Sequence, residues 1–311
     1  MTAAALSAAL LRRLLSAVGV LLGAATAAFI TLELIPGNPV SALLGPDTTA
    51  SPAVRAEITR QYGFNQPVIV QYLRYLDRLA HGDLGQSYQL QQPVIALIRG
   101  QLWPTAQLAL AAMLLAIAVA LISAVATAGR PALRAVASLC ELVAISTPSY
   151  WAGILLLTVF SFRFRLFPVA GAQNLSSLVL PAVTLALPVA GTLAQVLREN
   201  LEAVLGQPFV VTARARGLGR TAVLVRHALR HAAIPLVTLT GWVTGSLLGG
   251  AVLVESIFGR PGIGSLTLTS IENRDMPVVI GVVLLSALVF VVISATVDLL
   301  YTAIDPRLRT R

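Results

Sequence analysis

The sequence contains no lysine, and all 22 of its basic residues are arginine. This absence excludes the phosphate-binding lysine of P-loop ATPases, the lysine of kinases and a Schiff-base lysine. Any ATP used with this protein must therefore be hydrolysed by another chain. Cysteine is nearly absent too, since Cys140 is the one cysteine among 311 residues. An intrachain disulfide and a cysteine-based metal site are excluded.

Charged residues are also scarce, at 11% of the chain, whereas hydrophobic residues make up 57%. Soluble domains carry about 25% charged residues, so this chain lacks the charge needed to cover a water-facing surface. Disorder is excluded by the same numbers, because disordered segments are rich in charge and poor in aliphatic side chains. The composition predicts an integral membrane protein.

Six apolar stretches are long enough to cross a bilayer, because about 20 helical residues span a hydrocarbon core of about 30 Å. They are residues 14–34, 105–128, 142–160, 178–197, 232–254 and 276–300. None carries a charge near its centre, where a charge costs about 2.5–3.5 kcal/mol. The first is predicted to be an uncleaved anchor, since its apolar run exceeds the 7–15 residues of a signal peptide. The predicted fold class is an all-α membrane protein with six transmembrane helices.

Arginine is distributed unequally between the two sides that six spans would create. The side with both termini and the loops near residues 129–136 and 198–231 carries 13 arginines and three acids, against nine arginines and seven acids on the other. The positive-inside rule places the first side in the cytoplasm. The same bias explains the net charge of +9 without nucleic acid.

The predicted organisation follows from the spans and their orientation. It consists of a cytoplasmic N-terminus at 1–13, a first span at 14–34, an extracytoplasmic segment at 35–104, a core of five spans at 105–302 with a loop at 198–234, and a cytoplasmic C-terminus at 303–311.

The extracytoplasmic segment contains two predicted helices. The first begins at Ser51-Pro52, which supply an N-cap and a first-turn proline, and ends at Gly63. The second begins at Pro67 and has apolar residues at helical spacing. These are Ile69, Tyr72, Leu73 and Leu76. Two interpretations remain open: an interfacial cap on the outer membrane surface, or a docking surface or lid for something arriving from outside.

No catalytic constellation is present, and no metal site is predicted. His227 and His231 lie four residues apart, which is compatible with a metal, but no third ligand is identifiable and we expect structural or interface histidines. Prolines within the spans, such as Pro148, are tolerated where neighbours or a water-lined cavity satisfy the freed carbonyls. We therefore consider a translocation path. For its two carboxylates, Glu33 and Asp298, a structural capping or interhelical bond is the alternative. The candidate path residues are Ser146, Pro148, Tyr150, Trp151, Glu33 and Asp298.

The loop at residues 198–234 is the most informative segment. It predicts a helix, a turn at Gly206-Gln207-Pro208, and a short helix at 209–216 that Gly217 ends. Phe209 and Val210 are expected to form an apolar knob on this short helix. A second, amphipathic helix with Arg226 and Arg230 follows. Short helices edged with arginine bind lipid headgroups or another protein's cleft.

The residues of this loop resemble a known family. The run TARARGL at 212–218, followed by RHALR at 226–230 and Pro235, is similar to the cytoplasmic loop of the peptide-importer permeases of the ATP-binding cassette (ABC) superfamily. The resemblance covers essentially the whole chain. The other matching runs are PGNP at 36–39, GFNQP at 63–67, GDLGQS at 82–87, PSYW at 148–151, ESIFGRPGIG at 255–264, NRDMP at 273–277, DLLY at 298–301 and DPR at 305–307. It is closest to the first of the two permeases in dipeptide and oligopeptide systems.

The loop departs from the general importer loop in three respects. Val211 stands where that loop has glutamate, and the distance from Gly217 to Pro235 is longer. Both departures are typical of the peptide branch. His231 stands where asparagine is expected, with no clear consequence.

The resemblance implies partners and roles. It implies a second homologous permease, two ABC ATPase subunits, an extracytoplasmic peptide-binding protein and membrane lipid. No cofactor is implied in this chain, because ATP and Mg²⁺ would bind the ATPase subunits. The residues implied in ATPase coupling are Phe209, Val210, Val211, Thr212, Ala213, Arg214, Ala215, Arg216 and Gly217. Those assigned to binding-protein docking are Arg55, Arg74, Asp77, Arg260, Arg274 and Asp275.

The implied substrate is a dipeptide or oligopeptide, with nickel and glutathione as alternatives within the same family. A secondary transporter would show inverted repeats and ionisable residues at the membrane centre, and neither is visible. A non-transporting assembly factor is disfavoured by the proline-broken spans and the coupling-like loop.

Overall fold

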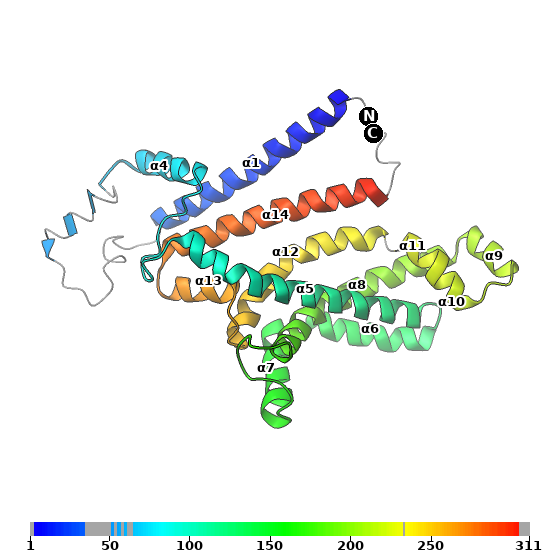
Figure 1. Ribbon diagram of the computed structural model, residues 1–311. Coiled ribbons are helices and arrows are strands. Elements are labelled where there is room, and N and C mark those ends of the chain that lie inside the picture. The colour runs from blue at the N-terminus through cyan, green and yellow to red at the C-terminus, as the bar shows by residue number, and fades with distance from the viewer. Residues whose placement is uncertain are drawn as a thin grey trace. The chain divides into compact units, whose positions relative to one another are not determined.

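The computed structural model describes residues 3–34, 51–52, 55–56, 59–60, 65–232 and 234–304. Every regular element within these ranges is a helix, which agrees with the predicted all-α class (Figure 1). The longer helices are α1 (Ala3–Leu34), α4 (Val68–Ala80), α5 (Val94–Thr127), α6 (Pro131–Ser146), α8 (Ser176–Leu205), α12 (Ile234–Ile257), α13 (Ile263–Glu272) and α14 (Met276–Ile304). The shorter ones are α7 (Ser149–Leu156), η1 (Leu157–Arg163), α9 (Pro208–Ala215), α10 (Arg220–Ala222), η2 (Val223–Ala228) and α11 (Leu229–Ala232), of which η1 and η2 are π-helical.

The chain divides into two compact units. The first comprises residues 1–103 and 265–291, and the second comprises residues 104–264 and 292–311. In the first unit α4 packs on α1 through aromatic rings: the Phe29 ring centroid lies 5.2 Å from that of Tyr72 and 5.7 Å from that of Tyr75. The hydroxyls of Thr26 and Tyr72 also form a 2.7 Å hydrogen bond. Aromatic contacts and this bond therefore hold α4 against the first apolar helix.

The second helix predicted in the outer segment is confirmed as α4, but its packed face differs from the expected one. Tyr75 is buried and Tyr72 and Leu76 are half-buried, whereas Ile69 and Leu73 are exposed. Spacing of apolar residues alone did not distinguish these two faces. The first predicted helix, from Ser51 to Gly63, falls largely outside the described residues.

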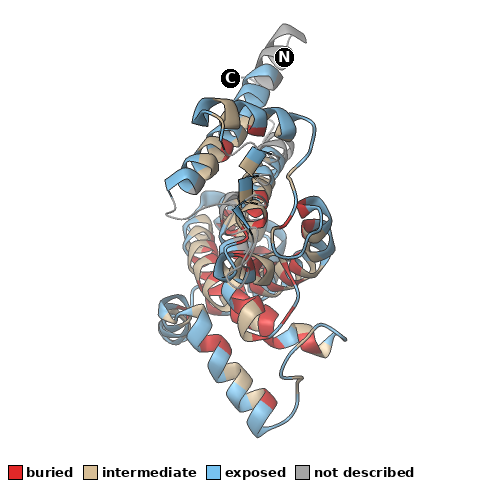
Figure 2. Ribbon diagram, turned by 90° about the vertical axis from the view of Figure 1, so that its left-hand side faces the viewer, coloured by how far each residue is buried: buried red, intermediate tan, exposed pale blue. Residues whose placement is uncertain are grey.

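Helix α8 is the central element of the second unit, where it packs against α6, α7, α11 and α12. The inner face of α5 in this unit is a stripe of alanines, one at every fourth residue, which continues to the residue just after the helix, and each is fully buried. They are Ala112, Ala116, Ala120, Ala124 and Ala128. Inside a membrane the hydrophobic effect does not drive helices together, and small side chains let them approach closely enough to pack. Figure 2 shows buried positions on the inner faces of packed helices and exposed positions on the outer faces. Many of the exposed residues are large and apolar.

Among the described residues, four helices are long and apolar enough to cross a membrane by length and composition. They are Leu11–Thr31, Val94–Thr127, Ser176–Leu205 and Met276–Val297. A fifth candidate is the bent pair Pro131–Ser146 and Ser149–Arg163. The predicted span at 232–254 falls on α12, a helix of 24 residues. The total of six spans stays a prediction.

The predicted span at 142–160 is not a straight helix, because its two halves meet at an angle of 102°. The bend lies at Thr147 and Pro148, where Thr147 has an extended backbone with ψ of 121°. The ring of a proline disfavours the α conformation in the preceding residue, so α6 ends there and α7 begins in a new direction. The proline is visible in the sequence, whereas the size of the bend depends on how α6 and α7 pack in the structure.

Candidate functional site

Helix α9 has the ends that the sequence predicted. Gln207 is its extended N-cap and Pro208 occupies the first turn, where the missing N–H costs nothing. The amide of Gly217 donates to the carbonyl of Arg214 at 2.9 Å, and Gly217 has φ of +83°. That left-handed conformation terminates a helix and is open to glycine without strain.

One face of α9 packs on the segment that follows it. Val210, 1% exposed, and the buried Ala213 contact Val223, with Leu205 and Leu218 packed around them. The predicted apolar knob of Phe209 and Val210 is therefore wrong in its second member, because Val210 faces inward.

The opposite face of α9 is open to solvent. Phe209 is 40% exposed and Val211 is 65% exposed, and the side chains of Arg214 and Arg216 are exposed as well. The ring of Phe209 lies 5.4 Å from that of His231, measured between centroids. The result is a short surface helix that exposes two apolar side chains and two guanidinium groups. Its other face lies on a packed base formed by Leu205, Leu218 and Val223.

The segment that follows α9 also contacts the end of α5. The guanidinium of Arg220 donates to the carbonyl of Ala128, the residue after the last of α5. A cation at this position satisfies an otherwise unpaired carbonyl and interacts favourably with the helix dipole. A cavity of about 330 Å³ lies beside this contact and is lined by Ala128, Gly129, Leu205, Arg214, Arg220 and Leu224.

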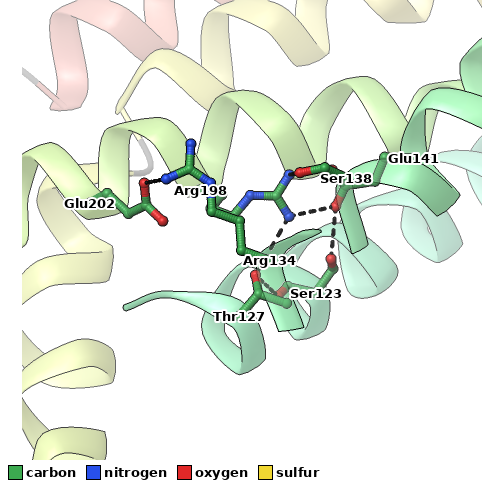
Figure 3. Close-up of polar contacts among 7 residues, drawn as sticks. All are labelled: Ser123, Thr127, Arg134, Ser138, Glu141, Arg198 and Glu202. Atoms are coloured by element: carbon green, nitrogen blue, oxygen red, sulfur yellow. Dashed lines mark hydrogen bonds and ion pairs between the residues drawn. The ribbon is translucent and has the colours of Figure 1, made fainter. Parts of the chain in front are cut away.

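The helix that leads into α9 carries a buried ion pair (Figure 3). Arg198 of α8, 3% exposed, forms two bonds to the carboxylate of Glu141 of α6, 6% exposed. Ser123 of α5 donates to the same carboxylate at 2.9 Å, and Arg198 also donates to Ser138 at 3.3 Å. Arg198 therefore lies buried between helices, whereas the sequence predicts an arginine that faces the cytoplasm.

Comparison with known proteins identifies the family. Residues 116–310 match the family described as "Binding-protein-dependent transport system inner membrane component", and residues 6–111 match the N-terminal region of such membrane components. The chain belongs to this family. It is a multi-pass inner-membrane permease of the ABC importer type, and therefore one component of a transport system with further subunits.

Individual relatives agree with this assignment. The permease is 36% identical over 302 residues to the glutathione transport system permease protein GsiC of Salmonella paratyphi A, with 96% of this chain and 98% of the relative covered. It is 38% identical over 318 residues to a Brucella abortus protein provisionally named a peptide transport system permease, with 98% and 99% covered. The solved inward-facing structure of the MetNI methionine ABC transporter covers 68% of the permease and 97% of its own chain, at a TM-score of 0.54 and 16% identity. That last similarity shows the fold alone.

The candidate path residues are placed in three regions of the permease. Ser146, Pro148, Tyr150 and Trp151 lie at the bend between α6 and α7, and all four are exposed. Glu33 is exposed near the end of α1, in the other compact unit. Asp298 lies in α14, and its side chain is outside the described residues. The assignment of these residues to a path stays a prediction.

Two of the residues assigned to binding-protein docking are buried, which corrects the prediction for them. Asp275, 2% exposed, accepts bonds from the Ser87 hydroxyl and, at 3.0 Å, from the Tyr88 amide. Arg260, 3% exposed, donates to Gln107 at 3.3 Å, and its burial lowers the pKa of the guanidinium. Asp275 joins the start of α14 to the loop before α5, and Arg260 joins the turn after α12 to α5 itself.

The other docking candidates are accessible to different degrees. Arg74 and Asp77 are exposed on α4, and Arg274 is exposed between α13 and α14. Arg55 is half-buried.

Sequence reasoning missed the role of Glu255, which is fully buried at the end of α12. Its carboxylate accepts bonds from the Thr105 hydroxyl at 2.6 Å and the Gly264 amide at 2.8 Å. A Cβ on Gly262 would come within 2.2 Å of this carboxylate. The run at 255–264 is therefore a turn wrapped around its own glutamate. An acid beside two nearby glycines was the available signal.

No cluster of three or more His, Cys, Asp or Glu side chains that could hold a metal ion lies among the described residues.

Proposed function

We propose that this chain is one of two permease subunits of an ABC importer for dipeptides and oligopeptides. The observation that carries the proposal is α9, a capped surface helix with exposed Phe209, Val211, Arg214 and Arg216 on a packed base. A partner cleft would bury the apolar pair and provide carboxylates for the guanidinium groups. A helix bound only to lipid headgroups would need the charges alone.

The proposed partner at α9 is one of two cytoplasmic ATPase subunits. ATP and Mg²⁺ bind those subunits, and this chain contributes no cofactor and no catalytic residue. Closure of the ATPase dimer displaces α9, and the attached helices move between inward-open and outward-open arrangements as rigid bodies. An extracytoplasmic binding protein delivers the substrate to the opposite face.

The proposed orientation places both termini and α9 in the cytoplasm. The arginine bias supports it even without Arg198, because the remaining arginines on this side still exceed its three acids.

The substrate class rests on the relatives. One is named for glutathione and another for peptides, and glutathione is itself a tripeptide. A pathway that accepts a flexible chain with an amide backbone would suit both glutathione and longer peptides. Nickel remains the alternative within the family.

Copurification and uptake together test the proposal. The tagged permease, expressed with its neighbouring genes, should recover two ATPases and a second permease, and vesicles of this complex should take up a labelled dipeptide in an ATP-dependent manner. Glutathione and Ni²⁺ serve as parallel substrates. Recovery of the tagged permease without any ATPase would exclude an ABC importer. Uptake of Ni²⁺ alone would show that the substrate is nickel and not a peptide.

A further inference from the structure

Helices α6 and α8 are joined by two ion pairs of different character. Arg198 and Glu141 form the buried one, in which Nη1 of Arg198 donates to Oε1 at 2.8 Å and Nη2 donates to Oε2. Arg134 and Glu202 form the second at 2.7 Å, and the side chain of Arg134 is 51% exposed. Two-point contact between a guanidinium and a carboxylate fixes direction as well as distance.

The surroundings of the buried pair leave neither charge an alternative partner. Ser123 and Ser138 complete the bonding, and the Thr127 hydroxyl lies 3.5 Å from Arg198 (Figure 3). All three are neutral, so loss of one charge would leave the other buried and uncompensated. The exposed pair has water as a substitute, and such pairs contribute little.

The contacts between α6 and α8 extend along both helices in antiparallel order. Gly191 faces the start of the contact, since a Cβ there would come within 2.9 Å of the Glu141 carbonyl and of Ile145. Arg198 then meets Glu141, and Glu202 meets Arg134. The 11 steps from Gly191 to Glu202 span about 16 Å at 1.5 Å per residue. A slide of one helical turn, about 5.4 Å, would break the two-point contact.

The pair of helices α6 and α8 lies between α9 and the bend at Pro148, two features whose movements are linked in the proposed importer. Helix α8 ends at Leu205, and only Gly206 and Gln207 separate it from α9. Helix α6 ends at Ser146, immediately before the 102° bend. A displacement of α9 therefore reaches the bend by two routes, through the contacts that hold α8 to α6 and through the direct packing of α8 on α7.

We propose that Arg198 and Glu141 are positioning residues that make α6 and α8 one rigid lever between α9 and the bend at Pro148. The inference rests on the proposed importer function and adds to it the element that transmits movement. Weakening the pair lets α8 move without carrying α6 along, so ATP is hydrolysed with less movement at the bend. The Ser123 bond attaches the end of α5 to the same lever.

The test measures peptide uptake per ATP hydrolysed in the complete reconstituted complex. Glu141→Gln keeps the size and bonding capacity of the side chain and removes its charge, and Arg198→Lys keeps the charge and removes the two-point contact. We expect each to lower uptake per ATP about tenfold, within the 5–150-fold range of allosteric coupling. Arg198→Lys keeps both charges, so basal ATPase activity and the amount of assembled complex should stay close to those of the wild type. Glu141→Gln leaves Arg198 buried without its counter-charge, so its uptake and ATP hydrolysis are compared per assembled complex.

Two further variants make the comparison specific. Arg134→Gln breaks the exposed pair on the same two helices and should leave uptake per ATP unchanged. The exchange Glu141→Arg with Arg198→Glu restores an ion pair in reversed order and should recover part of the lost coupling.

Normal uptake per ATP in Glu141→Gln or Arg198→Lys overturns the inference. So does a loss of uptake that only follows a loss of assembled complex, since that describes a bond needed for stability. Failure of the proposed function is a different outcome, because the wild-type complex would then import no peptide.

Discussion

At the residue scale, Gly217 isolates the effect of backbone conformation on α9. Its φ is +83° and a Cβ there would meet nothing within 4 Å, so Gly217→Val introduces strain without a clash. The left-handed conformation costs an L-residue about 1–2 kcal/mol, and a β-branched residue avoids it by turning the chain. We expect Gly217→Val to abolish uptake and substrate-stimulated ATPase activity, with helical content by circular dichroism unchanged.

The neighbouring Gly219 supplies the control for this variant. It also has open space around it, but its φ is −65°, so Gly219→Val should behave as the wild type. Normal uptake and normal stimulation in Gly217→Val would show that the direction of α9 is not set by this residue.

Phe209 tests the same helix through its side chain. Truncation to alanine removes the largest exposed apolar group of α9, and aromatic anchors of this kind contribute about 2 kcal/mol or more to docking. We expect Phe209→Ala to reduce ATPase recovery in copurification and to abolish uptake. Val225→Ala is the control, because Val225 is similarly exposed in η2. Equal recovery from both variants would remove Phe209 from the docking surface.

At the scale of elements, the turn between α12 and α13 depends on Gly264. A Cβ there would come within 2.4 Å of the Val252 Cα and 2.9 Å of the Glu255 carboxylate. Overpacking of this kind costs about 1–3 kcal/mol. Gly264→Ala should therefore lower the unfolding temperature of the purified permease, measured by thermal unfolding in detergent. Gly249→Ala in α12 meets nothing within 4 Å and should leave it unchanged or raise it.

Helix α4 allows the two interpretations of the outer segment to be separated. Reversal of its exposed charges, in Arg74→Glu with Asp77→Arg, should slow association of the binding protein while ATPase assembly stays intact, because rim charges act mainly on encounter. Surface plasmon resonance on the reconstituted complex measures the association rate. Arg130→Glu, at the exposed turn after α5, is the control. An unchanged rate would favour the interfacial cap.

At the scale of the whole molecule, topology is the prediction that carries the rest. Single cysteines at Thr59 and Gly219, in a Cys140→Ala background, should react with an impermeant thiol reagent from opposite sides of the membrane. The background change is needed because Cys140 is exposed. Labelling of both positions from the same side would contradict the six-span arrangement and the cytoplasmic placement of α9.

The features that could be predicted from the sequence are those that depend on local chemistry or on composition. The membrane class follows from 11% charged residues, and the apolar helices follow from their length. The ends of α9 were predicted from Pro208 and Gly217, because capping requires only neighbours in the chain. The family assignment rested on motif order and was confirmed by relatives covering nearly the whole chain.

The tertiary structure alone decided which side chains face inward. Val210 and Val211 are the same residue type on the same helix, yet one is buried against Val223 and the other is open. Arg260 and Asp275 looked like surface charges until their partners in distant segments were known. Glu141 and Arg198 are 57 residues apart, and no periodicity relates them. A helix that is apolar on all sides has no polar face to show which side points outward, so only packing determines which of its residues contact the neighbouring helices.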